Sequence, residues 1–193
     1  MAIGDVEKSF QTAALQDGVV LTRHKVPWIN QQGHFGLPPQ AGSAATALHA
    51  IFLALKGDAA VQAGKRTTAL PGDFVHVESG TVIEVDEFQH FTSHRRMTFD
   101  FYPADFPINY DLDEYQGLCQ RLAPRADSYR ATKDAIGFGS GGRQRQRAYY
   151  DALRDLALPS MAQPPIVRVP VVDGDGSGAY LRHRDRIVSA INR

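Results

Sequence analysis

Three carboxylates and a histidine lie close together in the sequence, around two runs rich in β-branched residues. Asp73 precedes the first run, Glu84 and Asp86 lie in the second, and His90 follows four residues later. Carboxylates held together repel one another and raise each other's pKa, unless a cation neutralises them. Oxygen-only ligands suit Mg²⁺ or Mn²⁺ rather than zinc. The stretch predicts a divalent-metal site with His90 as base, ligand or phosphate contact; a solvent-facing acidic strand that binds nothing is the alternative.

A β-hairpin is the element expected to gather these acids. The runs 74–77 and 81–86 flank a polar turn sequence, which is typical of two antiparallel strands. Side chains alternate between the faces of a strand, so Glu84 and Asp86 share one face. A two-residue turn would place Asp73 directly opposite Glu84, with Cβ atoms about 4.5–5.5 Å apart.

The rest of the chain reads as alternating helices and strands. The 193 residues suit a single domain. Apolar spacing and flanking glycines predict helices over 4–17, 44–56, 112–122, 143–158 and 179–192, and strands over 19–21 and 166–172. This order indicates a mixed α/β class. Residues 91–111 have no clean period, and Pro124 is expected to end the helix that begins at 112.

Residues 71–91 read PGDFVHVESGTVIEVDEFQHF. This segment resembles the core motif of the PD-(D/E)xK nuclease superfamily, in which an acid opens one strand and an acidic pair ends the next. More narrowly, it resembles the branch containing the very-short-patch mismatch repair endonuclease and related uncharacterised domains. That branch has E-h-D-G-x-x-H, then a helix with D-x-x-R-x-x-x-L and a strand ending hhR. Residues 150–156 (YDALRDL) and 166–169 (IVRV) are similar to that helix and strand.

The sequence departs from the family pattern at several positions. Glu87 stands where relatives have glycine, and Gly72 separates Pro71 from Asp73. The lysine of the commonest motif is replaced by Asp86, as in the histidine-bearing branch. Residues 91–145 are longer than the link in relatives and are expected to be an insertion within the single domain 1–193.

The resemblance implies a restriction-endonuclease-like core, with a central mixed β-sheet flanked by helices and a hairpin that bears the acidic site. It implies hydrolysis of phosphodiester bonds in nucleic acid, with DNA as the expected substrate. Asp73, Glu84 and Asp86 would hold Mg²⁺ or Mn²⁺, and Glu7 on the first helix is a candidate additional ligand. His90 would act as general base or hydrogen-bond to the scissile phosphate.

Basic residues predict where nucleic acid would lie. Arg143, Arg145 and Arg147 alternate at the start of a helix, where free backbone N–H groups also favour phosphate. A solvated helix face is the alternative. The further candidate contacts are Gln89, Arg95 and Arg168. For Arg168, within an apolar strand, an ion pair with a nearby aspartate is the competing interpretation.

Composition excludes several classes of protein. Lys and Arg together number 21, as do Asp and Glu, so the chain is not a histone-like polycation. One cysteine, Cys119, excludes an internal disulfide framework and a Cys-rich zinc site. No apolar run approaches a membrane span, and no secretory signal is visible, so no membrane partner and a cytoplasmic location are expected.

Two other functions remain open at this stage. One is a catalytically inactive nuclease-like module for nucleic-acid binding or assembly, which the balanced charge and Glu87 favour. The other is a small-molecule hydrolase that uses His90 and the acids. DNA against RNA, strandedness and a homodimeric state are likewise open.

Overall fold

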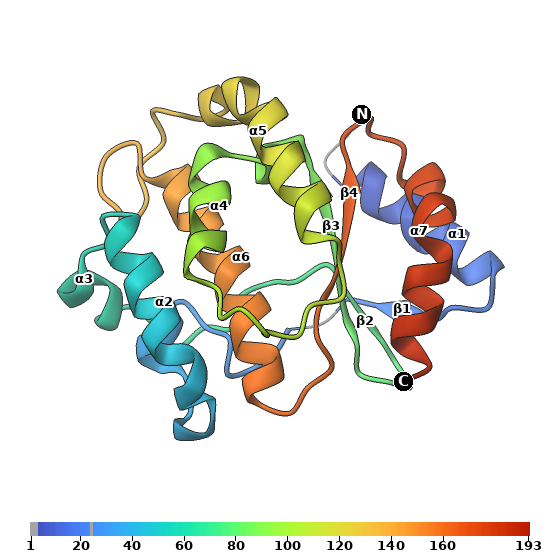
Figure 1. Ribbon diagram of the computed structural model, residues 1–193, viewed down its shortest axis with the longest axis horizontal. Coiled ribbons are helices and arrows are strands. Elements are labelled where there is room, and N and C mark those ends of the chain that lie inside the picture. Colours follow the sequence, from blue (N-terminus) through green and yellow to red (C-terminus); the bar gives the residue numbers. More distant parts are fainter. Residues whose placement is uncertain (1–3, 24) are drawn as a thin grey trace.

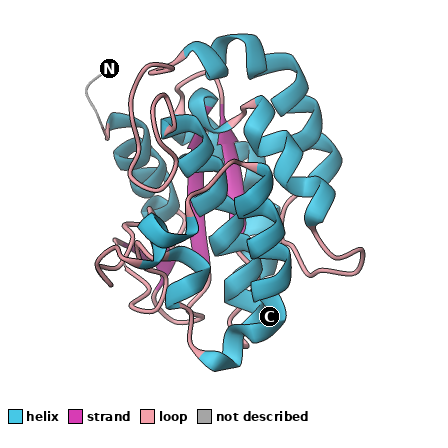
Figure 2. Cartoon of the chain, turned by 90° about the vertical axis from the view of Figure 1, so that its left-hand side faces the viewer, coloured by secondary structure: helices cyan, strands magenta, loops and turns pink. Residues whose placement is uncertain are grey.

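The computed structural model describes residues 4–23 and 25–193, and this part of the chain builds one mixed β-sheet with helices on both faces (Figures 1 and 2). The strands, in spatial order, are β1 (Leu21–Thr22), β2 (Phe74–His76), β3 (Val82–Glu87) and β4 (Val167–Val171). β2 runs antiparallel to both β1 and β3, and β4 is parallel to β3. The mixed α/β class is therefore confirmed.

The β2–β3 hairpin has the register expected from the sequence. Val75 pairs with Val82 and Phe74 with Ile83, as predicted. The turn itself is longer than the predicted two residues, because the His76 N–H donates to the Thr81 carbonyl and encloses residues 77–80. Val82 packs into the core on one side of the sheet, whereas Ile83 and Val85 pack into the core on the other. The alternation therefore turns Glu84 toward the same side as Val82.

Two helices cover one face of the sheet. These are α1 (Asp5–Gln16) and α7 (Gly176–Ile191). Val6, Phe10 and Ala14 recur every four residues, so α1 presents one apolar stripe to the strands. This packing directs the first turn of α1, which contains Glu7, toward the end of the hairpin that begins at Asp73.

The opposite face is covered by a larger layer of helices. Its members are α2 (Gly42–Ala54), α4 (Ser93–Thr98), α5 (Leu112–Ser128) and α6 (Arg143–Ser160), with the short α3 (Ala59–Ala63) beside α2 (Figure 1). The single-turn helices are η1 (Gly33–Gly36), η2 (Pro39–Ala41), η3 (Phe88–His90) and η4 (Phe99–Phe101). α6 lies at the centre of this layer, and its Ala148, Ala152 and Leu156 are buried. None of the described helices is both long enough and apolar enough to cross a membrane.

Several elements differ from the sequence prediction. α5 continues through Pro124 to Ser128, because Gln144 of α6 donates hydrogen bonds to the carbonyls of Ala126 and Tyr129 and holds its last turn. α7 begins at Gly176, three residues earlier than predicted, because Asp175 caps it by accepting from the Gly178 N–H. The predicted strand 19–21 is reduced to the two-residue β1.

Residues 91–145 contribute to the main core. Phe91, Phe99 and Tyr115 are buried in the same apolar cluster as α2 and α6. Residues 91–111 lack a regular period because they contain only the short α4 and the single turn η4.

Candidate active site

A cleft of about 740 Å³ runs along the exposed side of α6. It lies between that helix, the end of β3 and the first turn of α1. Among the residues predicted for the site, those lining the cleft are Glu7, Asp73, Glu84, Gln89, His90, Arg143 and Arg147. The structure therefore brings most of the sequence-predicted site to one hollow.

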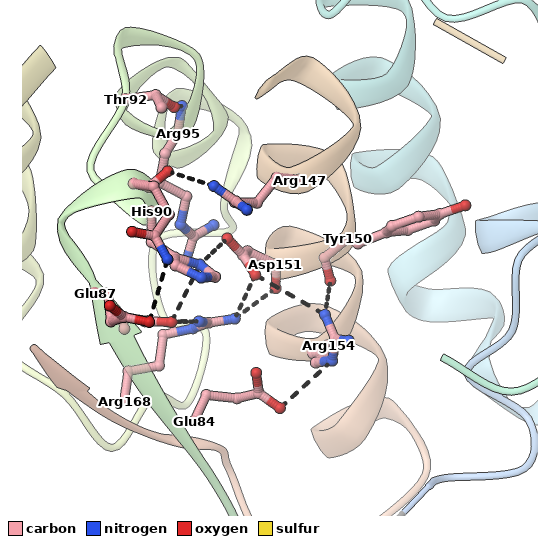
Figure 3. Close-up of polar contacts among 12 residues, drawn as sticks. Glu84, Glu87, His90, Thr92, Arg95, Arg147, Tyr150, Asp151, Arg154 and Arg168 are labelled. Atoms are coloured by element: carbon pink, nitrogen blue, oxygen red, sulfur yellow. Dashed lines mark hydrogen bonds and ion pairs between the residues drawn. The ribbon is translucent and has the colours of Figure 1, made fainter. Parts of the chain in front are cut away.

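Asp73 and Glu84 are the acids that the hairpin presents to this cleft. The Asp73 carboxylate accepts the Val85 N–H at 2.8 Å, and Glu84 accepts the Asp73 N–H at 3.3 Å. Burial, together with the charge of Glu84, raises the pKa of Asp73 to about 7. Burial likewise raises the pKa of Glu84, against the opposing effect of Arg154, whose Nε lies 3.6 Å from Oε1 (Figure 3). The pair therefore holds negative charge that its surroundings compensate only in part.

Glu7 reaches the cleft from α1. Its Oε2 is buried and has no hydrogen-bond partner among the described residues. A buried carboxylate oxygen without a partner is costly, so it marks a position where a ligand is expected. This fits the prediction that Glu7 assists a cation at the hairpin acids.

Asp86 differs from the other two hairpin acids. It is only 1% exposed and accepts the Arg168 guanidinium at 2.8 and 3.1 Å and the Tyr115 hydroxyl at 2.8 Å. The sequence predicted that Asp86 joins Asp73 and Glu84 around one ion. In the structure both Asp86 oxygens already accept hydrogen bonds from Arg168 and Tyr115, so Asp86 does not serve as a third ligand. Asp86 instead contacts His90, with 3.3 Å between Oδ1 and Nδ1.

His90 is held by two carboxylates at the edge of the cleft. Its Nδ1 lies 3.0 Å from Asp151 Oδ2 as well as 3.3 Å from Asp86 (Figure 3). Burial alone would lower the pKa of His90, but Asp151 and Asp86 outweigh it and raise the pKa. Contacts at Nδ1 fix the ring and leave Nε2 as the nitrogen able to serve a substrate.

A buried ion network lies behind His90. Arg168 Nε donates to Asp155 at 2.6 Å, and Arg95 donates to the other oxygen of the same carboxylate at 2.6 Å. Tyr102 and Tyr110 each donate to Asp155 at 2.7 Å. Burial would raise the pKa of Asp155, but the two guanidinium groups outweigh it and lower the pKa.

Arg95 and Arg168 were predicted as nucleic-acid contacts, and for both the prediction is wrong. Arg168 is fully buried and Arg95 is 1% exposed, so a nucleic acid cannot reach either side chain. For Arg168 the competing interpretation, an ion pair with a nearby aspartate, is confirmed by its contact with Asp155.

One group of three potential metal-ligating side chains stands out among the described residues. Ligand atoms of Asp86, His90 and Asp151 lie within 4.8 Å of one another, and Asp73 and Glu84 are outside this group. Arg168 pairs with Asp86 at 2.8 Å and lies 3.8 Å from Asp151. Because Arg168 and His90 already neutralise these two acids, a cation gains more at the less compensated Asp73 and Glu84.

The basic side chains fall into two groups. Arg143 and Arg147 line the cleft, and so do Lys65, Lys133 and Arg154, which were not among the predicted contacts. Arg154 is the arginine of the D-x-x-R pattern in residues 150–156, and it lies on the same helix face as Arg147, so the sequence offered a signal for it. Lys65 and Lys133 lie in loops, where spacing gives no such signal. Arg145 instead donates to the carbonyls of Phe138 and Ser140, in the glycine-rich loop of residues 137–142. Gln89 lines the cleft and donates weakly to Glu87 at 3.4 Å.

Comparison with known proteins adds no relative. No family model, curated protein or solved structure matches the chain. The chemistry open to the cleft therefore rests on the residues described above.

Proposed function

We propose that the protein is a divalent-metal-dependent nuclease that hydrolyses phosphodiester bonds of nucleic acid, with DNA as the expected substrate. The observation that carries the proposal is the cleft itself. It sets the partly compensated acids Asp73 and Glu84 beside basic side chains from α6 and two distant loops. The basic side chains would neutralise the phosphates of a nucleic acid. A bound metal ion would be needed at Asp73 and Glu84, because these acids otherwise repel a phosphate.

The order of elements supports the same proposal. A helix precedes three antiparallel strands, and after α6 a fourth strand lies parallel to β3. The acid before β2 and the acid within β3 occupy the positions that the resemblance to the PD-(D/E)xK superfamily assigns to metal ligands. We therefore infer a restriction-endonuclease-like core.

The donor set fits Mg²⁺ or Mn²⁺. Mg²⁺ is usually held by one or two carboxylates and keeps several waters, so Asp73 and Glu84 would hold the ion, with Glu7 as the additional candidate. When bound, such an ion supplies a water of lowered pKa and neutralises charge on the phosphate.

The other side chains bind and orient the substrate. Two carboxylates at Nδ1 raise the pKa of His90, and in the protonated ring Nε2 would donate a hydrogen bond to a phosphate oxygen. Asp86 and Asp151 hold the orientation of the imidazole ring through Nδ1 and favour its protonated form. Arg154, beside Glu84, keeps the carboxylate directed into the cleft.

Cleavage assays on two variants of the hairpin test the proposal. Glu84→Gln should abolish Mg²⁺- or Mn²⁺-dependent cleavage, with a loss larger than the roughly 10–100-fold typical of outer-shell partners. Glu78→Gln changes an exposed acid in the turn of the same hairpin and should cleave as the wild type does. Cleavage that survives Glu84→Gln would overturn the proposal.

One observation favours a different function. Arg154 already pairs with Glu84, so an internal cation partly occupies the place of a metal. A nuclease-like module that binds nucleic acid without cutting it would need no more than this. Such a module would bind DNA in a salt-dependent manner, bind no Mn²⁺ and cut nothing.

A further inference from the structure

The floor of the cleft is a single stripe of α6. Its members occur at spacings of three and four residues, which places them on one helix face. They are Arg143, Gln146, Arg147, Tyr150, Asp151 and Arg154. Glu84 contacts the stripe at Arg154 and His90 contacts it at Asp151, so the reacting phosphate belongs near these two positions.

Both walls of the cleft are tied to this floor. On one side Arg147 donates to the Gln89 carbonyl at 3.1 Å (Figure 3). On the other side Gln146 donates to the Ile136 carbonyl at 3.3 Å, and Lys65 bridges that carbonyl at 3.2 Å to the Tyr150 hydroxyl at 2.8 Å. The width of the cleft is thus fixed by hydrogen bonds on both sides.

The volume of the cleft limits what can enter. At about 740 Å³ it lies in the range of pockets that enclose a drug-sized ligand, about 300–1,000 Å³. A few nucleotides of one strand are of that size. A duplex, whose major groove alone is about 12 Å wide, is far larger.

Cations follow one another along the floor, away from the acids. Arg147 precedes Asp151 by four residues and Arg143 precedes Arg147 by four, so each step is about 6 Å along the helix. This is a spacing suited to successive phosphates of one strand. Arg143 stands at the first residue of α6, where the N-cap Gly142 gives no side-chain cap. Its Nε is buried without a hydrogen-bond partner among the described residues.

We propose that the cleft binds a single strand of nucleic acid along α6, with the scissile phosphate at Asp73 and Glu84 and the next two phosphates at Arg147 and Arg143. The proposal rests on the proposed function for its scissile position. Its preference for one strand over a duplex depends only on the walls and floor.

Cleavage of three substrates tests this proposal. They are a single-stranded DNA oligonucleotide, the blunt duplex of the same sequence, and the p-nitrophenyl ester of thymidine 5′-phosphate, which lacks the distant phosphates. The single strand should be cut more than tenfold faster than the duplex. Arg143→Ala should lower kcat/KM on the oligonucleotide about tenfold, since a good charged contact is worth about 1.4 kcal/mol or more. The loss on the ester should be smaller, because the ester lacks the phosphate that Arg143 would contact. Arg143→Lys should restore part of the loss, and Arg121→Ala, an exposed change on α5, should have no effect.

A binding experiment separates this proposal from the proposed function. Fluorescence anisotropy of Glu84→Gln with labelled strand and duplex measures preference without cleavage. Tighter binding of the single strand than of the duplex would support the proposal. So would a slope of log K against log salt concentration that is smaller by about one in the double variant Glu84→Gln, Arg143→Ala. Equal or tighter binding of the duplex would overturn it. The same measurement with a DNA and an RNA oligonucleotide of one sequence shows which nucleic acid the cleft prefers. If the wild type cuts neither oligonucleotide nor ester, the nuclease function fails and the binding result still decides strandedness.

Discussion

Two groups of buried acids on this side of the sheet have opposite environments. Asp73 and Glu84 share a cleft, and their pKa values are raised because burial and neighbouring acids outweigh the nearby cations. Asp151 and Asp155 on α6 are buried more completely, yet their pKa values are lowered because His90, Arg168 and Arg95 surround them. Burial is common to both groups, so compensation is what differs. We infer that the fully compensated acids, Asp151 and Asp155, are scaffold and that the less compensated pair, Asp73 and Glu84, is the site.

The largest expected effect is on the scaffold group. Asp155→Asn removes the carboxylate that pairs with the buried Arg95 and leaves Arg168 with Asp86 and Asp151. Removing one partner of a buried ion pair costs about 3–5 kcal/mol. Urea denaturation at pH 7 would measure the loss in the free energy of unfolding. The matched control is Asp173→Asn, which breaks the exposed pair with Arg182 and should cost less than about 1 kcal/mol. Equal losses in the two variants would contradict the distinction between scaffold and site.

Metal should stabilise the protein in a pH-dependent manner. Asp73 has a pKa of about 7 in the fold, against an ordinary value near 4, so the fold favours the protonated acid. The contribution of this group to stability is therefore full below about pH 4 and is lost as the pH rises through 7.

Above pH 7, where the Asp73 carboxylate has lost its proton, bound Mn²⁺ should neutralise the carboxylate instead. At a free concentration of about 100 times its dissociation constant, the ion adds about 2.7 kcal/mol to the free energy of unfolding. The rise in Tm on adding Mn²⁺ should therefore be large at pH 8 and small at pH 5.5, as measured by differential scanning calorimetry. A rise of the same size at both pH values would contradict a site at Asp73.

A smaller effect of opposite sign is expected when an acid is removed from the open pair. Without metal, Glu84→Gln relieves repulsion with Asp73 and should stabilise the fold at pH 8 by on the order of 1 kcal/mol, as functional residues often do when neutralised. Urea denaturation in the presence of a chelator measures it. A loss of several kcal/mol would instead place Glu84 in the scaffold.

The sequence predicted the hairpin and its acids correctly because that information is local. A period of two and a short turn fix the pairing of Val75 with Val82, and so the position of Asp73. The helix bounds failed where distant residues intervene, as at Pro124, where Gln144 holds the last turn of α5. Tertiary packing there outweighs the local preference of proline.

The scaffold group could not be predicted in the same way. Its pairs join residues far apart, such as Arg168 with Asp86 and Arg95 with Asp155. No local period reports such pairs, and an arginine in an apolar strand suggests an ion pair without showing which aspartate is its partner. Lys65 and Lys133 reach the cleft from loops, where spacing carries no information about direction.

Binding of Mn²⁺ tests the central claim most directly. Isothermal titration calorimetry at pH 8 would compare the wild type with Asp73→Asn, Glu78→Gln and His90→Gln. If the ion binds at Asp73 and Glu84, binding should be lost in Asp73→Asn and retained in both Glu78→Gln and His90→Gln. Binding that persists in Asp73→Asn and disappears in His90→Gln would contradict the claim, because it would assign the ion to Asp86, His90 and Asp151.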